Sequence, residues 1–516
     1  MTTVTTYPGV YIEEMPSSVR TITGVSTSVT AFIGRALKGP TNKATLIHSF
    51  AEFERLFGGL WKESIMSYSV YLYFLNGGND AVIVRIHNGA KAATITRDGA
   101  PPSPLPLEAA NPGSWGNKLK LTINREVPKA KLDEDASYFN MYVKDADGNI
   151  LETFLNLSLK KDSPRIVSKV LESESSLVRV TGEIPSIKEA DYPKIIGDYV
   201  AKDGSDGSAP KNEDVIGNPG TPEKPEKTGI YSLDDADMIN LLCIPSYADD
   251  NTASSVYTAA LDYCEKRRAI LLVDPPSGWK NKDAPKDKAK GIDGFGVARH
   301  KNAAIFFPRI KIADPNDDGR LRSIVPCGAV AGVIARTDSQ RGIWKSPAGI
   351  EATLRGVIDL DVNLTDRENG ELNPLGINCL RVMGVAGRVI WGARTMVGAD
   401  GLADQWKYLS VRRMALYIEE CLYRGTQWVV FEPNDEPLWS QIRLNVGAFM
   451  HDLFRKGAFQ GSTPKEAYLV KCDKETTTQY DIDRGIVNIV VGFAPLKPAE
   501  FVIIKIQQLA GQKEEA

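Results

Sequence analysis

The chain has 516 residues, of which 42% are hydrophobic and 25% are charged, and its formal net charge is −3. This length predicts about three domains, and the near-average composition excludes bulk disorder. Nucleic acids and acidic membrane surfaces attract proteins with a marked basic excess, so the near-neutral charge predicts neither as a partner.

The cysteines and the apolar segments argue against a metal site and against a membrane span. The six cysteines are widely spaced and form no C-x-x-C pair, so we expect buried thiols in a reducing compartment. The longest apolar run, 324–335, has 12 residues, whereas a bilayer span needs about 20. The N-terminus lacks the basic and apolar regions of a secretory signal. We therefore expect synthesis in the cytoplasm and no direct membrane insertion.

The first 98 residues predict an extended arm followed by alternating elements. Residues 1–24 form the arm, in which Tyr7-Pro8-Gly9 disfavours a helix and Val10-Tyr11-Ile12 is typical of a strand. Alternation over 25–98 favours an α/β sheet covered by helices. The expected elements are strands at 30–34 and 81–86 and helices at 50–57 and 65–75.

A change of composition marks a second domain. Five prolines between Pro101 and Pro112 end the alternation. Strand-like runs and an Asp147-Gly148 turn follow, which predicts a β-rich outer domain over 99–229, inserted into the α/β domain. Its last part, 201–229, is rich in glycine, proline and charge, and we expect a mobile loop there.

The α/β pattern resumes at residue 230 and ends near 395. We expect strands at 239–245, 270–273 and 303–307 and helices at 253–267 and 323–335. These elements predict the second half of a mostly parallel sheet. The α/β domain is therefore discontinuous, made of 25–98 and 230–395.

The C-terminal third, 396–516, predicts an α+β domain. Amphipathic patterns favour a helix over 408–424 and another from about residue 438. Strand patterns follow at 467–472, 486–493 and 501–506, the last of them close to the end of the chain.

No pattern in the chain predicts chemistry. The sequence has no P-loop, no H-E-x-x-H helix and no G-x-S-x-G turn. Four histidines leave few candidates for a general base, and the carboxylate pairs are adjacent in sequence, so that their side chains diverge. We expect a protein that is not an enzyme and that has no catalytic, cofactor or metal site.

Ordered motifs over most of the length carry a resemblance. They are Tyr7-Pro8-Gly9-Val10-Tyr11-Ile12, Arg341-Gly342-Ile343-Trp344, Trp391-Gly392-Ala393-Arg394-Thr395, Gly425-Thr426-Gln427-Trp428, Phe431-Glu432-Pro433-Asn434-Asp435 and Lys497-Pro498-Ala499-Glu500-Phe501-Val502. With these motifs the chain resembles the contractile tail sheath family of bacteriophages, R-type bacteriocins and extracellular contractile injection systems.

The resemblance implies a fold and a function. The α/β domain would be subtilisin-like in fold and without catalysis. Copies of the chain would stack as hexameric rings around an inner tube protein, bounded by baseplate and terminal cap proteins, and the sheath would contract to drive the tube through a target envelope. The particle would be a phage tail or a tail-like particle, whose release would be by lysis. Which of the three machines this is stays open.

The two chain ends are the expected contacts between subunits. A strand from one copy can complete the open sheet of another, and the expected donors are Val10, Tyr11, Ile12, Phe501, Val502, Ile503 and Ile504. The alternative is that both ends pair within their own subunit.

The second C-terminal helix offers candidates for contact with the tube. These are Arg443, Arg455 and Lys456, with Arg412 and Arg413 as second choices. The alternative is a solvated surface without a partner. Two other classes of protein stay open, an enzyme of subtilisin-like fold and a self-assembling shell protein.

Overall fold

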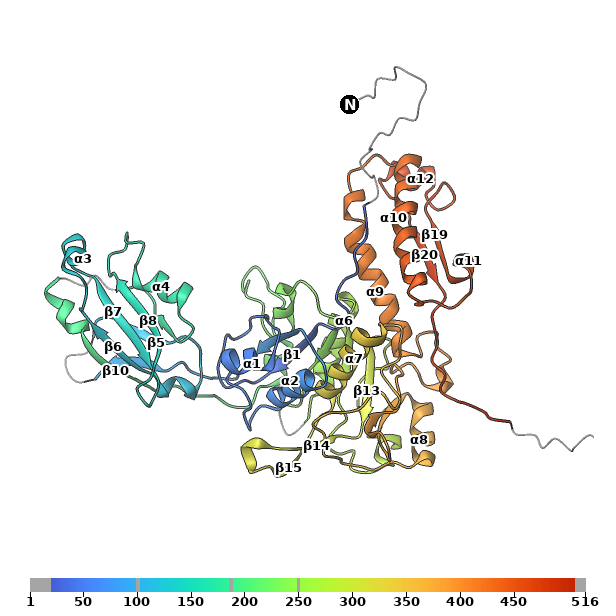
Figure 1. Cartoon of the computed structure of the whole chain (residues 1–516), viewed down its shortest axis with the longest axis horizontal. Coiled ribbons are helices and arrows are strands. Elements are labelled where there is room, and N and C mark those ends of the chain that lie inside the picture. Colours follow the sequence, from blue (N-terminus) through green and yellow to red (C-terminus); the bar gives the residue numbers. More distant parts are fainter. Residues whose placement is uncertain (1–19, 99–102, 185–188, 248–250, 506–516) are drawn as a thin grey trace, which may run out of the picture. The chain divides into compact units, whose positions relative to one another are not determined.

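The computed structural model describes residues 20–98, 103–184, 189–247 and 251–505 (Figure 1). It divides into two compact units. The α/β unit consists of Ser26–Gln340 and Pro347–Lys407. The C-terminal unit consists of Met1–Val25, Arg341–Ser346 and Tyr408–Ala516, and is described from Arg20 to Lys505. The predicted mixed α/β, multi-domain class is confirmed.

An eight-stranded sheet forms the centre of the α/β unit, in the order β18-β17-β13-β12-β11-β1-β3-β2. Its strands are β1 (Thr30–Gly34), β2 (Thr45–Ile47), β3 (Ala81–Arg85), β11 (Leu241–Cys243), β12 (Ile270–Val273), β13 (Ala303–Phe307), β17 (Ile377–Met383) and β18 (Gly387–Ile390). The six strands from β17 to β3 run parallel, and β18 and β2 are antiparallel at the edges. β1 pairs with both β3 and β11, so this sheet contains strands from either side of residues 99–229.

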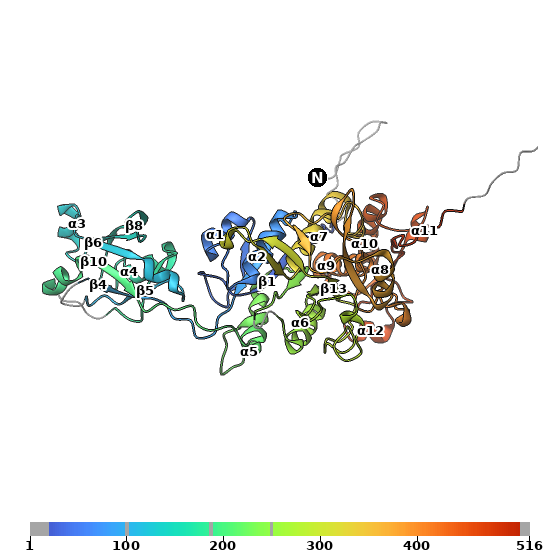
Figure 2. The same ribbon diagram turned by 90° about the horizontal axis from the view of Figure 1, so that it is seen from below.

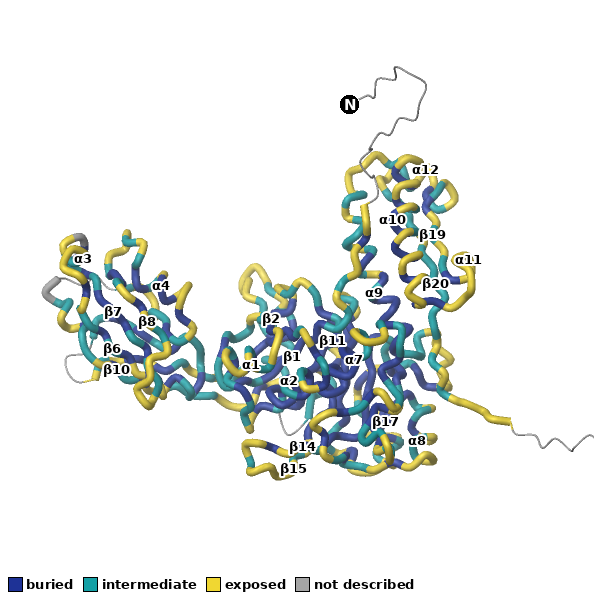
Figure 3. Tube along the Cα trace, viewed as in Figure 1, coloured by how far each residue is buried: buried dark blue, intermediate teal, exposed yellow. Residues whose placement is uncertain are grey.

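Helices cover this sheet. They are α1 (Phe50–Phe57), α2 (Ile65–Leu75), α6 (Ser254–Lys266), α7 (Cys327–Arg341) and α8 (Asp366–Leu372). Strands β1 and β11 are buried along their whole length, and β17 is buried from Ile377 to Arg381 (Figure 3). Ser49 and Ser64 cap the first two helices by accepting hydrogen bonds from the N–H groups of Glu52 and Ser67.

One helix differs from its prediction. The sequence predicted a helix over 323–335, but Leu321–Ile324 is strand β15 and α7 begins only at Cys327. Ile324 pairs with Ile310, so the first part of the apolar run belongs to a sheet. This small sheet has the order β15-β14-β16, with β14 at Ile310–Ala313 and β16 at Asp359–Leu360.

The inserted domain is a seven-stranded antiparallel sheet in the order β8-β7-β6-β10-β4-β5-β9 (Figures 1 and 2). Its strands are β4 (Thr94–Arg97), β5 (Leu107–Ala109), β6 (Lys120–Asn124), β7 (Phe139–Lys144), β8 (Ile150–Leu157), β9 (Val178–Val180) and β10 (Gly197–Lys202), with helices α3 (Lys129–Glu134) and α4 (Val167–Glu174). Val167, Val170 and Leu171 of α4 belong to its core. β4 belongs to this sheet although it precedes the expected boundary at residue 99.

The segment 201–229 is not the loop that its composition predicted. β10 extends to Lys202, and Asn212–Ile216 is a short helix, α5. Val215 is fully buried in the core of the main sheet, together with Ile230. The prediction of a mobile loop is therefore wrong for α5, because a single well-placed valine outweighs the polar composition around it.

The C-terminal unit packs two helices against a two-stranded sheet. Its elements are α9 (Leu409–Gly425), α10 (Glu436–Arg455), α11 (Pro464–Ala467), β19 (Tyr468–Lys471), α12 (Gln479–Asp483) and β20 (Val490–Phe493). The apolar faces of both long helices meet in one core that includes Met414, Ile418, Ile442 and Phe449. The two predicted helices are confirmed.

Short 3₁₀ helices complete the chain. They are η1 (Ser114–Lys118), η2 (Glu189–Ile195), η3 (Gly229–Asp235), η4 (Ala284–Lys286), η5 (Pro315–Asp317), η6 (Asn373–Leu375), η7 (Asp400–Leu402) and η8 (Gln427–Val429). All six cysteines are buried free thiols. Within the described ranges, no helix combines the length and the apolar character that a bilayer crossing requires.

Candidate assembly site

The sheet of the C-terminal unit has one covered face. β19 and β20 are antiparallel, with Tyr468 opposite Phe493 and Val470 opposite Val491. These four side chains pack against the core of the unit. The ring of Phe459 lies 5.7 Å from that of Phe493 and 6.3 Å from that of Tyr468. Aromatic contacts therefore hold this face of the sheet in place.

The other face of this sheet is exposed, and no third strand lies along it in the described part of the chain, although Phe459 forms a single bridge to Pro495 just beyond β20. Leu469 and Val490 point away from the core and remain 47% and 46% exposed. Among the described residues, β19 and β20 each pair with no other strand. Two strands alone are marginally stable, and their outer N–H and C=O groups form a template for a further strand.

The predicted donor at the end of the chain is not paired in the subunit. The sequence predicted a strand over 501–506, yet Phe501–Lys505 has no strand geometry. The side chains of Phe501, Val502, Ile503 and Ile504 are 75–82% exposed. The intramolecular alternative is therefore not what the described part of this segment adopts. Four consecutive large apolar side chains in water form an exposed patch of the kind that is typical of interaction sites.

The N-terminal donor cannot be placed in the same way. Val10, Tyr11 and Ile12 lie outside the described residues. The chain that follows them packs on its own subunit. Arg20 N–H donates a 3.2 Å hydrogen bond to Asn445 Oδ1, and its guanidinium lies 4.7 Å from the ring centre of Trp428. Residues 20–25 thus belong to the C-terminal unit and do not form a free arm.

The candidates for contact with a tube fall into two groups. Arg455 and Lys456 are exposed, Lys456 in an ion pair of 2.6 Å with Asp452. Arg443 is partly buried, forms a 2.6 Å ion pair with Glu436 and donates to the carbonyl of Cys472. All three remain predictions.

The second-choice candidates are corrected. Arg412 and Arg413 of α9 are only 6% and 3% exposed. Arg412 contacts Glu419 over 3.4 Å, about two turns further along α9. Buried arginines paired inside the subunit cannot serve as its contact surface, so the proposal for these two residues is wrong. Arg412 and Arg413 are adjacent in sequence, which suggested a solvated face of the helix. Both residues are buried, because α9 is covered on more than one side.

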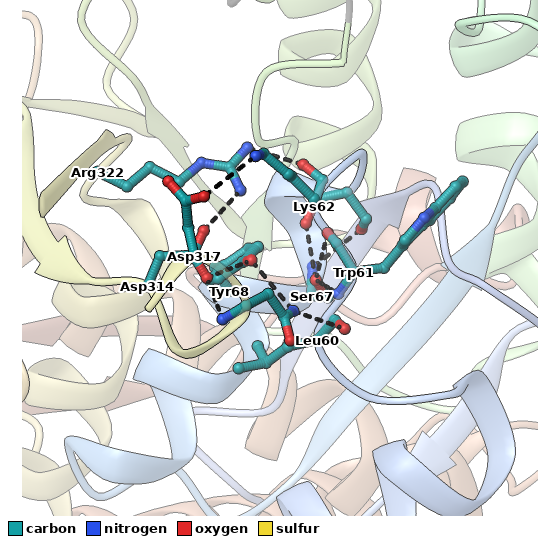
Figure 4. Close-up of polar contacts among 10 residues, drawn as sticks. Leu60, Trp61, Lys62, Ser67, Tyr68, Asp314, Asp317 and Arg322 are labelled. Carbon is teal, nitrogen blue, oxygen red and sulfur yellow. Dashed lines mark hydrogen bonds and ion pairs between the residues drawn. The ribbon is translucent and has the colours of Figure 1, made fainter. Parts of the chain in front are cut away.

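A buried polar network fixes the hairpin of β14 and β15 to the segment before α2 (Figure 4). Tyr68 donates a 2.8 Å hydrogen bond to Asp314 Oδ1, and Arg322 lies 3.3 Å from Asp314 Oδ2. The Arg322 guanidinium also stacks over the Tyr68 ring and donates to the Lys62 carbonyl. Burial would raise the pKa of Asp314, but hydrogen bonds from Asn316, Tyr68 and Arg322 outweigh it and hold that pKa below its usual value.

The loop of this hairpin has part of the spacing of a calcium-binding loop. Asp314, Asn316, Asp318 and Gly319 fit the first half of the pattern D-x-[DN]-x-[DN]-G-x5-E, but Val325 stands where that pattern has its glutamate. In the structure, however, Arg322 occupies the position beside Asp314, and Lys62 lies 3.5 Å from Asp317. Across the described ranges, no three His, Cys, Asp or Glu side chains gather as metal ligands. Side-chain cations, Arg322 and Lys62, lie beside the carboxylates of this loop.

Asp274 is an acid with a raised pKa at the carboxyl ends of the parallel strands, where α/β proteins often place functional groups. It follows β12, accepts a 3.1 Å hydrogen bond from the N–H of Cys327 and is fully enclosed. Desolvation raises its pKa to about 7, against the weaker opposing effects of Cys327 and Arg309. Burial also raises the pKa of the Cys327 thiol, which makes that thiol a poor nucleophile.

Family comparisons agree with the motifs. The central domain of phage tail sheath proteins matches residues 230–396, and the phage tail sheath C-terminal domain matches residues 403–508. The chain belongs to the phage tail sheath family. The prediction of this family from the motifs is confirmed.

Individual relatives are distant in sequence. The tail sheath protein of Vibrio phage KVP40 is 24% identical over 301 residues, which are 54% of this chain and 43% of the relative. The chain therefore aligns with less than half of that protein.

Solved structures share the fold over nearly the whole length. A chain of the anti-feeding prophage baseplate, determined by cryo-EM with six-fold symmetrisation, has a TM-score of 0.59 at 23% identity, covering 98% of this chain and 99% of that one. A chain of the sheath complex of PVC, an extracellular contractile injection system in its contracted state, has a TM-score of 0.58 at 22% identity with the same coverage.

Proposed function

We propose that copies of this chain stack as hexameric rings around an inner tube, and that the sheath they form contracts to drive the tube through a target envelope. The observation that carries this proposal is a mismatch within one subunit. The C-terminal segment 501–505 has strand-forming side chains and pairs with no described strand, while the sheet of β19 and β20 has no third strand among the described residues. A segment of one copy is the natural complement of the sheet of the next.

Such an exchange is a heterologous contact, because the C-terminal segment of one copy, here called the tail and defined by Phe501–Ile504, meets the sheet of β19 and β20 in another copy. Heterologous contacts generate rings or open helices, which are the two symmetries of a sheath. Support for six subunits in a ring comes from the six-fold symmetrised anti-feeding prophage baseplate. Support for contraction comes from the contracted PVC sheath.

Contraction needs a source of free energy. The sequence has no P-loop, and the family is structural, so we propose that contraction draws on free energy stored when the extended sheath is built. We further propose that Arg443, Arg455 and Lys456 contact the inner tube, that baseplate and cap proteins bound the sheath, and that a particle made in the cytoplasm is released by lysis. The subtilisin-like description of the α/β unit belongs to the same proposal.

Electron microscopy of the purified chain at high concentration tests this function. We expect hollow helical cylinders built from six-membered rings. Flat lattices or closed shells would favour the shell-protein alternative instead. Folded protein that stays monomeric by light scattering under all assembly conditions would contradict the proposal.

A further inference from the structure

The exposed C-terminal segment is apolar on both of its sides. In an extended strand, successive side chains point to opposite faces. Phe501 and Ile503 therefore occupy one face, and Val502 and Ile504 the other. All four are at least 75% exposed in the subunit. A strand with one solvated face alternates apolar and polar residues, whereas a run that is apolar throughout is typical of a strand buried on both faces.

The sheet that this segment would join is covered on one face only. Tyr468, Val470, Val491 and Phe493 face the core of the C-terminal unit. Leu469, Lys471, Val490 and Gly492 face outward, and about half of the surface of Leu469 and Val490 is in water.

An added strand continues both faces of a sheet, whichever edge it joins and in whichever direction it runs. One apolar pair of the tail then lies on the core side, and the other pair lies beside Leu469 and Val490. Strand addition alone would leave that enlarged apolar face in water.

We propose that the outward face of β19 and β20, defined by Leu469 and Val490 and widened by the donated tail, is a second interface, covered by the body of another copy of this chain. This inference rests on the proposed function. Strand exchange joins two copies by backbone hydrogen bonds, and the second interface adds side-chain packing on the outward face of the sheet. The completed sheet lies between the core of its own subunit and a neighbouring subunit.

Another copy fits this face better than the inner tube does. Large apolar contacts are typical of permanent associations. In the proposed function, neighbouring subunits stay joined while the sheath contracts, whereas the grip of the sheath on the tube has to be released. The outward face is also continuous with the strand-exchange contact, which is itself a contact between copies.

Two substitutions in the tail distinguish donation of the strand from burial of its outward face at the second interface. Val502→Glu and Ile503→Glu each place a charge on one face of the same strand. Both side chains are exposed in the subunit, so both variants should keep the wild-type Tm. We expect each of them to reduce tube formation at least tenfold by sedimentation and electron microscopy, while Val502→Ile and Ile503→Val assemble normally.

The outcomes of this comparison are distinct. If only one of the two glutamate variants fails to assemble, the tail is donated but lies on a sheet with a solvated face, and the second interface is overturned. If both form normal tubes, tail donation itself is wrong and the proposed function loses its main support.

The acceptor side gives an independent test. Leu469→Glu should leave the Tm of the subunit unchanged and abolish tubes. The matched control is Leu151→Glu in β8 of the inserted domain, where the side chain is similarly exposed at 49%, and it should assemble like wild type. Normal tubes from Leu469→Glu would also overturn the second interface.

Discussion

Tyr68 and Asp314, 246 residues apart in sequence, are joined by a 2.8 Å hydrogen bond that connects α2 to the hairpin of β14 and β15. Both residues are almost completely buried. Tyr68→Phe removes the hydroxyl donor and leaves a buried carboxylate oxygen with one partner fewer. We expect the free energy of unfolding to fall by about 1–3 kcal/mol, measured by urea denaturation. Tyr480→Phe, at an exposed tyrosine, is the control and should change it by less than about 0.5 kcal/mol.

Close packing of α7 on α2 makes Gly328 indispensable. A Cβ atom there would lie 2.1 Å from the carbonyl oxygen of Ser69, which belongs to backbone and cannot swing away. Gly328→Ala should therefore destabilise the protein by about 1–3 kcal/mol. Gly447→Ala in α10, where a Cβ would meet nothing within 4 Å, is the matched control. It should stabilise by about 0.5–1 kcal/mol, because alanine favours the helix. Equal effects of the two substitutions would contradict this packing.

Asp274 should make stability depend on pH. Its pKa is raised by desolvation to about 7, so the folded protein holds one proton more than the unfolded chain between about pH 4 and pH 7. The contribution of Asp274 is fully present below that window and is lost as the pH rises through it, with a slope of up to about 1.4 kcal/mol per pH unit. Asp274→Asn should remove this slope, measured as Tm from pH 4.5 to 8. An unchanged profile would show that Asp274 is ionised in the folded state.

The segment 201–229 should not tolerate deletion as a whole. Removing it would take away the end of β10 and the buried Val215, and we expect insoluble protein. The shorter loop 219–227 is a different case, because Asn218 and Thr228 hydrogen-bond across its base. Replacing 219–227 by a two-glycine turn should leave the Tm within a few degrees of wild type. Soluble, folded protein from the full deletion would refute the anchoring role of α5.

Sequence patterns were sufficient where local chemistry decides the structure. β1, α1 and α2 have the predicted bounds, because Ser49 and Ser64 cap the helices and the apolar periodicity is clear. Prediction was wrong where distant contacts decide. The pairing of Ile324 with Ile310 turned the start of a predicted helix into a strand, and a single buried Val215 anchored a segment of polar composition.

The candidate site shows the same division. The strand pattern of Phe501–Ile504 is readable in the sequence, but its partner is not, since no described strand of its own subunit pairs with it. Amphipathicity identified the apolar face of α9, yet it could not show that Arg412 and Arg413 are covered by other elements. Hydrophobic periodicity can identify β19 and β20 as strands, but it cannot show which other strands lie beside them in a sheet.

Removing the tail tests the central claim most directly. In a chain ending at Glu500, the four exposed apolar side chains are gone, while the core of the C-terminal unit is intact. Thermal unfolding and electron microscopy on the same preparation should show a wild-type Tm and no tubes, because each contact between subunits lacks its donated strand. Normal tubes from the truncated chain would contradict strand donation, and a lowered Tm without tubes would show that the segment belongs to its own subunit.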